Sequence, residues 1–180
     1  LVAESCPDLD LLSFQIYGAI DKLPGFLQES NYKGAYMITE WGATGHWECD
    51  STSWDRPIEA NSSVKANNYH ARYVDYIAAD TKQCIGSFVF LWGQKQERTP
   101  TWYGLFLDNN NSTEAAQVMQ YLWTGKWAQH RIPKIGQLSI NGMLAEESVC
   151  LQQDQTYNAK IELETSHKNL SFRWELMKEV

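Results

Sequence analysis

Three apolar runs, separated by amphipathic segments, dominate the first two thirds of the chain. The runs cover residues 10–18, 35–42 and 84–93, and each ends at a glycine. They are rich in aromatic and aliphatic residues, which favour strands. The segments that follow them have apolar residues at intervals of three and four, typical of helices, at 20–30, where Pro24-Gly25 interrupts the spacing, and at 62–79 and 113–125. The order β-α-β-α-β-α predicts an α/β domain whose parallel sheet is covered on both faces.

Beyond residue 127 the apolar pattern changes from a helical period to a period of two. This pattern predicts an antiparallel all-β module, with a turn at Asn141 and Gly142. We therefore expect a first domain at 1–127, a linker at 128–134 and a β module at 135–180. Three βα units leave an open sheet edge, and so few β strands do not close a sandwich. We expect both parts to be pieces of larger domains.

Composition and charge narrow the class of partner. The net charge is -7 with 15 Lys and Arg residues, so no basic stripe is available to neutralise phosphates, and nucleic acid is not expected as a partner. No apolar run approaches the roughly 20 residues that span a bilayer, so membrane insertion is not expected either. Eight Trp and nine Tyr residues suit the apolar faces of sugar rings, although aromatic residues also fill cores.

The cysteines and glycines do not indicate a cofactor. Cys6, Cys49, Cys84 and Cys150 lack the C-x-x-C spacing of a metal site, so no metal is predicted. Free thiols and a single disulfide both remain open. No G-x-G-x-x-G or Walker loop follows a strand, which disfavours a nucleotide-binding domain.

Glu40 is the sharpest candidate for chemistry. It lies in the sequence Ile38-Thr39-Glu40-Trp41-Gly42, at the carboxyl end of a buried strand. Active sites of parallel barrels lie at that end, and an unpaired carboxylate on an apolar strand is costly unless it has a partner or a role. The alternative is a strand-end glutamate that is solvated or bound in a salt bridge.

The three strand ends together resemble a known group of enzymes. They are Tyr17-Gly18, Glu40-Trp41-Gly42 and Trp92-Gly93, and over residues 8–125 their order is similar to the closing half of the retaining β-glycosidase barrels that include glycoside hydrolase families 2 and 5. The resemblance implies the last three βα units of a (β/α)8 TIM barrel. It implies Glu40 as the nucleophile, Tyr17 as a hydrogen-bond donor to it, and Trp92 as a platform under the sugar.

The resemblance also implies an oligo- or polysaccharide substrate with β-linkages and no cofactor. The acid/base of such enzymes follows a fourth strand that this chain lacks, so we expect the chain alone to be catalytically incomplete and its longer parent to be extracellular or periplasmic. Further substrate contacts are expected from residues beside the strand ends, namely Trp41, His46, Trp47, Gln94 and Lys95. Burial of Trp47 as an anchor of its loop is the alternative.

Other acidic loop residues are interpreted as solvated charges: Glu48, Asp50, Asp55 and Glu97. For Glu48 a contact with a sugar hydroxyl stays open. The competing function is a carbohydrate-binding or adhesion protein without catalysis, built on a degenerate barrel.

The last residues resemble the immunoglobulin-like or cadherin-like modules appended to such enzymes. The similarity lies in the segments 159–163 and 170–175, which predict two neighbouring strands of a truncated β-sandwich. The turn at 165–169 lacks the acidic signature of a calcium site, so calcium is not expected.

Overall fold

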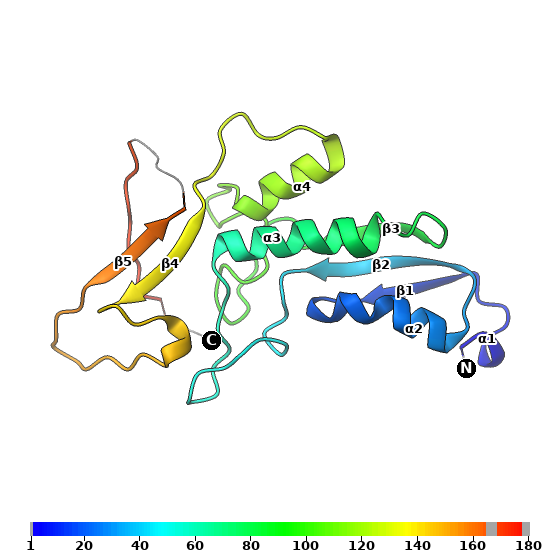
Figure 1. The fold of residues 1–180 in the computed structure, drawn as a ribbon, viewed down its shortest axis with the longest axis horizontal. Coiled ribbons are helices and arrows are strands. Elements are labelled where there is room, and N and C mark those ends of the chain that lie inside the picture. The colour runs from blue at the N-terminus through cyan, green and yellow to red at the C-terminus, as the bar shows by residue number, and fades with distance from the viewer. Residues whose placement is uncertain (1, 165–168, 178–180) are drawn as a thin grey trace.

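The computed structural model describes residues 2–164 and 169–177. Its parallel sheet has three strands: β1 (Leu11–Gln15), β2 (Ala35–Gly42) and β3 (Cys84–Phe90). Its α-helices are α1 (Val2–Ser5), α2 (Leu23–Ser30), α3 (Ser62–Arg72) and α4 (Glu114–Thr124). Shorter turns of helix are η1 (Gly18–Lys22), η2 (Tyr73–Ile77) and η3 (Ala145–Glu147), and a second, antiparallel sheet consists of β4 (Ile135–Ile140) and β5 (Ala159–Leu163) (Figure 1).

The parallel sheet has its strands in chain order. β1 pairs with β2 and β2 with β3, both in parallel, and the intervening helices make the crossovers. The prediction that the three apolar runs are adjacent, parallel strands is therefore confirmed. In such a sheet all three carboxyl ends lie along one edge, which is what brings the residues after each strand together.

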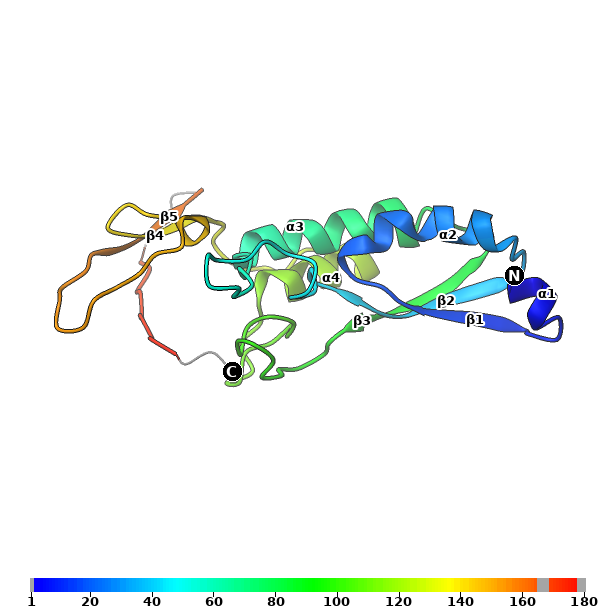
Figure 2. The same ribbon diagram turned by 90° about the horizontal axis from the view of Figure 1, so that it is seen from below.

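The helices α2, α3 and α4 lie on one side of the parallel sheet (Figure 2). The prediction of a sheet covered on both faces is not confirmed within the described residues, where these helices cover one face (Figure 2). Strands that follow one another in chain order, with every helix on the same side, form a singly wound sheet, whereas a doubly wound sheet reverses its strand order. Within the described residues β1 and β3 each border one strand, so the sheet is open at both edges.

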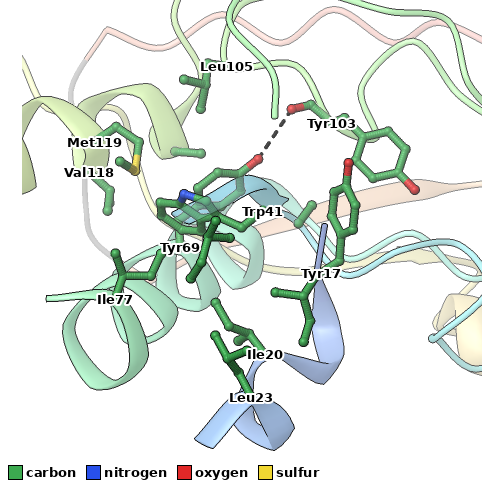
Figure 3. Packing of buried hydrophobic residues seen from close by; sticks show 14 of the residues in the cluster. Tyr17, Ile20, Leu23, Trp41, Tyr69, Ile77, Tyr103, Leu105, Val118 and Met119 are labelled. Carbon is green, nitrogen blue, oxygen red and sulfur yellow. Dashed lines mark hydrogen bonds between the residues drawn. The ribbon is translucent and has the colours of Figure 1, made fainter. Parts of the chain in front are cut away.

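The core lies between the sheet and these helices. Trp41 is its largest fully buried side chain and lies beside Tyr69 (Figure 3). The Trp41 ring contacts those of Tyr69 and Tyr73 at centroid distances of 5.7 and 5.9 Å. Met119 of α4 and Ile20 of η1 close the same cluster. Burial of such aromatic side chains stabilises the packing of the helices on the sheet and fixes the position of β2 relative to α3.

Helix boundaries follow the capping residues that the sequence provides. The Asn61 side chain accepts hydrogen bonds from the backbone N–H groups of Ser63 and Val64 and begins α3. Thr113 caps α4, and Gly125, with φ of 70°, ends it as predicted. The helix predicted over 62–79 is α3 continued by the π-helical turn η2.

The β module is smaller than the sequence predicts. β4 and β5 are antiparallel, and Asn141 and Gly142, both with positive φ, form the predicted turn, in which Ile140 and Met143 exchange backbone hydrogen bonds. Residues 170–177, however, form no strand, although Phe172 and Trp174 alternate with polar residues. Both rings are more than half exposed because the two-stranded sheet offers no second layer to cover them. The short helix η3 contradicts the prediction that this module contains strands and no helix. Most of the turn predicted at 165–169 lies outside the described residues.

The segment predicted as a linker is fixed to α4. The side chain of Gln117 bonds to the backbone of both His130 and Ile132, at 2.8 and 3.0 Å. The Trp127 ring stacks on Tyr121 at 4.2 Å, and the Arg131 guanidinium lies 3.5 Å from the Trp127 ring centroid. The β module thus begins from an anchored segment.

The start of β4 is fixed to α3 in turn. The hydroxyl of buried Ser63 accepts a hydrogen bond from the Ile135 N–H at 2.8 Å and donates one to the buried carboxylate of Glu114. The Asn61 amide donates to the Gly136 carbonyl at 2.9 Å.

Candidate functional site

The carboxylate of Glu40 accepts hydrogen bonds from two side chains at the carboxyl end of β1. Gln15 Nε2 donates a hydrogen bond to Glu40 Oε1 at 3.1 Å, and the Tyr17 hydroxyl donates one to Oε2 at 2.9 Å. The contact between Tyr17 and Glu40 that the sequence predicts is thus present. Two charge-assisted hydrogen bonds to one carboxylate fix its orientation.

A β-bulge gives Glu40 this position. Phe14 pairs with Ile38, but Gln15 pairs with Glu40, so Thr39 is an extra residue on β2. Paired residues of neighbouring strands point to the same face, so the bulge places Gln15 beside Glu40. The Thr39 hydroxyl bonds to the Phe14 carbonyl at 3.2 Å, and the Ile16 N–H bonds to the Glu40 carbonyl at 2.9 Å, which holds the irregular segment in place.

Tyr17 stays protonated and acts as a donor. Its side chain is 8% exposed and meets the rings of Trp47, Phe90 and Tyr103 edge-on at centroid distances of 5.6 to 5.9 Å. Burial and the hydrogen bond to Glu40 raise the pKa of Tyr17 well above its usual range. The hydroxyl is therefore neutral at every pH at which the protein is expected to work.

A cavity of about 360 Å³ opens above Glu40. Two kinds of side chain line it: aromatic rings, from Tyr17, Trp47, Phe90 and Tyr103, and polar or charged groups, from Gln15, Glu40, Lys95 and Glu97. We call this space, with these eight residues, the Glu40 cavity. Its size falls in the range of ligand pockets, and aromatic walls with a few polar groups are the usual make-up of such pockets.

Trp47 and Lys95 line the Glu40 cavity, whereas His46, also expected to contact substrate, does not line it and instead contacts Glu97. Trp47 lines the Glu40 cavity and is 60% exposed, so it does not anchor its loop by burial. Lys95 lines the cavity as well, with Nζ 2.6 Å from Glu97 Oε2. His46 Nε2 lies 3.4 Å from Glu97 Oε1, so His46 supports Glu97.

Trp41 does not belong to the site. We expected it to contact substrate, but its side chain is 0% exposed in the core beneath the sheet. The bulge at Thr39 is the reason, because one extra residue shifts Trp41 to the face that already carries Tyr36 and Ile38. Its indole N–H has no hydrogen-bond partner among the described residues.

Trp92 and Gln94 also lie outside the Glu40 cavity. Trp92 is 69% exposed and rests against Phe106 at a centroid distance of 4.8 Å, so it does not line the cavity with Tyr17 and Glu40. The Gln94 amide donates to the Pro100 carbonyl at 3.1 Å and thereby holds its own loop. Phe90 and Tyr103, and not the Trp92 that the resemblance implies as a platform under the sugar, contribute aromatic rings to the cavity.

Glu48 is exposed, as expected of a loop charge, and does not line the Glu40 cavity, but the backbone also holds its carboxylate. Its carboxylate accepts hydrogen bonds from the backbone N–H groups of Gly18, Ala19 and Gly45, at 2.6, 2.9 and 2.9 Å. It therefore connects the segment after β1 with the segment after β2. We call this set of four residues the Glu48 junction.

The glycine of the Glu40 motif and a buried arginine fix the end of β2. A Cβ on Gly42 would lie 2.4 Å from the Phe90 carbonyl oxygen, so β2 and β3 approach this closely only with glycine. Arg72 Nη1 donates to the Gly42 carbonyl at 2.6 Å and Nη2 to the Thr44 hydroxyl at 2.7 Å. Burial lowers the pKa of the Arg72 guanidinium.

Four residues of the Glu40 cavity were missed by the sequence analysis. Gln15 carries a signal in hindsight, because it is a polar residue in an apolar run, two positions before Tyr17. Phe90 resembles any other core residue of its strand. Glu97 and Tyr103 lie in a long loop, where no local pattern indicates which residues turn toward the cavity. Burial raises the pKa of Tyr103 to about 12.

The described residues form no metal site, disulfide or membrane-spanning helix, but they form a second cavity. They contain no group of three His, Cys, Asp or Glu residues placed for a metal ion, and the four cysteines are free thiols. No described helix has the length and apolar character needed to cross a membrane. A larger cavity of about 1050 Å³ lies where α3 and α4 meet β4, but none of the site residues predicted from the sequence lines it.

Comparison with known proteins finds no protein family that matches the chain and no curated protein that matches its sequence. The geometry of the site therefore carries the functional argument.

Proposed function

We propose that this chain is the nucleophile-bearing part of a retaining glycoside hydrolase that acts on β-linked glycans, and that Glu40 is the nucleophile. One observation carries the proposal. At the carboxyl edge of a singly wound parallel sheet, a carboxylate with two side-chain donors opens into a cavity of about 360 Å³ with aromatic walls. A TIM barrel places its active site at that edge, and in this proposal β1 to β3 are its last three strands.

The arrangement fits the first step of a retaining mechanism. One Glu40 oxygen attacks the anomeric carbon and forms a covalent glycosyl ester, while the glycosidic oxygen leaves with a proton from a second carboxyl group about 5 Å away. Tyr17 and Gln15 keep the carboxylate oriented before the attack. The aromatic walls bind the sugar ring and exclude water from the cavity.

Glu97, the other carboxylate of the cavity, does not suit the role of acid. The Lys95 ammonium, which bonds to Glu97, and the nearby His46 lower the pKa of Glu97, so it is ionised at neutral pH. A general acid needs a raised pKa. The proposal therefore places the acid in earlier βα units of a longer parent protein, and the β module in an immunoglobulin-like domain appended to the barrel.

The same observation favours one alternative. A cavity whose described carboxylates lack a protonated partner also suits a carbohydrate-binding or adhesion protein without catalysis. The exposed ring of Trp47 at the cavity supports sugar binding in either case.

Chemical rescue in the intact protein separates these functions. Glu40→Ala removes the attacking oxygen, and azide is small enough to enter the space and attack in its place. We expect Glu40→Ala to be inactive on aryl β-glycosides and azide to restore turnover with an α-glycosyl azide as product. The control Glu48→Ala should gain nothing from azide. An inactive wild type that still binds sugar would favour the alternative, and a fully active Glu40→Ala would overturn the role of Glu40.

A further inference from the structure

A charged pair forms one wall of the Glu40 cavity. Lys95 Nζ and Glu97 Oε2 lie 2.6 Å apart, and both side chains line the cavity together with Glu40. Glu97 was interpreted as a solvated loop charge, but its side chain is 28% exposed and faces the site. Lys95 Nζ is also 5.2 Å from the centroid of the Phe90 ring.

The loop holds Glu97 in one position. Arg98 has a φ of 61°, and on either side of it Glu97 and Thr99 exchange backbone hydrogen bonds of 2.7 and 3.3 Å. His46 Nε2 lies 3.4 Å from the Glu97 oxygen that does not face Lys95. A carboxylate supported from three directions is preorganised for recognition, and little entropy is lost when a ligand binds to it.

We propose, on the basis of the glycosidase function above, that Lys95 and Glu97 determine the specificity of the cavity by binding two neighbouring hydroxyl groups of an uncharged sugar ring. An ammonium group only donates hydrogen bonds and a carboxylate only accepts them. A hydroxyl group does both, so a pair of adjacent hydroxyls can donate to Glu97 and accept from Lys95 at the same time.

Charge excludes the competing class of sugar. Among the described residues that line the cavity, Glu40 and Glu97 bring two negative charges and Lys95 one positive charge. A uronic acid would add a carboxylate to a site that already has an excess of negative charge, and Lys95 is already neutralised by Glu97. Like charges at close range in a partly buried site cost affinity. The cavity therefore selects hexoses over hexuronic acids.

The test compares matched substrates in the intact protein. We would measure kcat/KM for 4-nitrophenyl β-glycosides of hexoses and of the uronic acids of the same configuration. The wild type should prefer the hexoside by about 100-fold, and Glu97→Gln should lower that preference by about 10-fold or more. Lys95→Met should weaken hexose binding without improving the uronide. Glu162→Gln is the matched control, because Glu162 pairs with Lys160 at 2.7 Å on exposed β5.

The outcomes keep this inference separate from the proposed function. A wild type that prefers uronides, or a Glu97→Gln variant with an unchanged preference, overturns the specificity while leaving Glu40 as nucleophile. If neither substrate is cleaved, the glycosidase proposal fails. Saturation-transfer NMR with free hexoses and uronic acids then tests the specificity: the hexose should bind to the wild type and lose binding in Glu97→Gln. Equal binding of both sugars would contradict it.

Discussion

The Glu40 cavity and the Glu48 junction both hold a carboxylate near the end of β2, but in different ways. Glu40 accepts hydrogen bonds from two side chains and faces open space, whereas Glu48 accepts from three backbone N–H groups of two loops. Backbone donors cannot move away without changing the fold, so Glu48 ties the loops together. Side-chain donors leave room for a ligand beside the carboxylate. The comparison shows how surroundings, more than residue type, separate a site from a structural crosslink.

The comparison also explains why the two regions depend on each other. Glu48 bonds to the N–H groups of Gly18 and Ala19, which directly follow Tyr17. The Glu48 junction therefore fixes the backbone that presents the Tyr17 hydroxyl to Glu40. Substitutions in the junction should act on the stability of the fold, and substitutions in the cavity should act on turnover.

The largest effect is expected from Glu40→Gln. The amide has nearly the same shape as the carboxylate but is no nucleophile, so kcat should fall by about four orders of magnitude in the intact protein. Sugar binding and the unfolding temperature should change little. Steady-state kinetics and thermal unfolding check this prediction. Near-normal turnover would show that Glu40, like Glu48, has a structural role.

Tyr17→Phe should have the second largest effect. It removes the hydroxyl that bonds to Glu40 Oε2 at 2.9 Å and keeps the ring that packs against Trp47. We expect kcat/KM to fall by about 100-fold, as is typical of a lost group that orients a reacting residue. Kinetics on the same aryl glycosides measure it. Trp92→Phe serves as the control, because Trp92 lies outside the Glu40 cavity, and a larger loss there would reverse the assignment of the two aromatic residues.

Glu48→Gln should lower the free energy of unfolding by about 2 kcal/mol, because the amide keeps one acceptor oxygen and its NH2 group cannot accept, so at least one of the three backbone N–H groups loses its partner. Turnover of the folded variant should stay within about threefold of the wild type, because the lost hydrogen bonds lie outside the Glu40 cavity. Urea denaturation and kinetics of the same preparation separate these quantities. Loss of activity at unchanged stability would place Glu48 in the site.

The smallest effect concerns the pH dependence of Tyr17. Because the folded-state pKa of Tyr17 is raised above the usual value near 10, its contribution to stability is complete below about pH 10 and is lost as the pH rises further. Ultraviolet titration of tyrosinate should therefore give the same absorbance for the wild type and Tyr17→Phe up to about pH 10.5. A difference at lower pH would show that the Tyr17 hydroxyl ionises and does not remain a donor to Glu40.

The fold was predictable where periodicity carries the information. The strands β1 to β3 and their helices follow from apolar runs and capping residues such as Thr113 and Gly125. The meeting of Tyr17 and Glu40 followed as well, since parallel strands bring their carboxyl ends to one edge. These features depend on local sequence and on general rules of topology.

The other features of the fold and the site depend on tertiary contacts, which the periodicity of apolar residues does not indicate. Strict alternation would place Trp41 on the face opposite Ile38, and the bulge at Thr39 reverses this. Glu97 and Tyr103 reach the cavity through a loop whose path is set by contacts with other segments. The alternating pattern at 170–177 predicts a strand, but alternation does not supply the second layer that such a strand needs.

Covalent labelling of the intact protein tests the central claim most directly. A 2-deoxy-2-fluoro β-glycoside with a good leaving group traps the glycosyl ester of a retaining enzyme, because the fluorine slows its hydrolysis. Mass spectrometry of the digested protein then locates the sugar. The account predicts that the label lies on Glu40 and that Glu40→Gln takes up none. A label on another carboxylate would contradict the account and leave Glu40 a structural residue at the end of its strand.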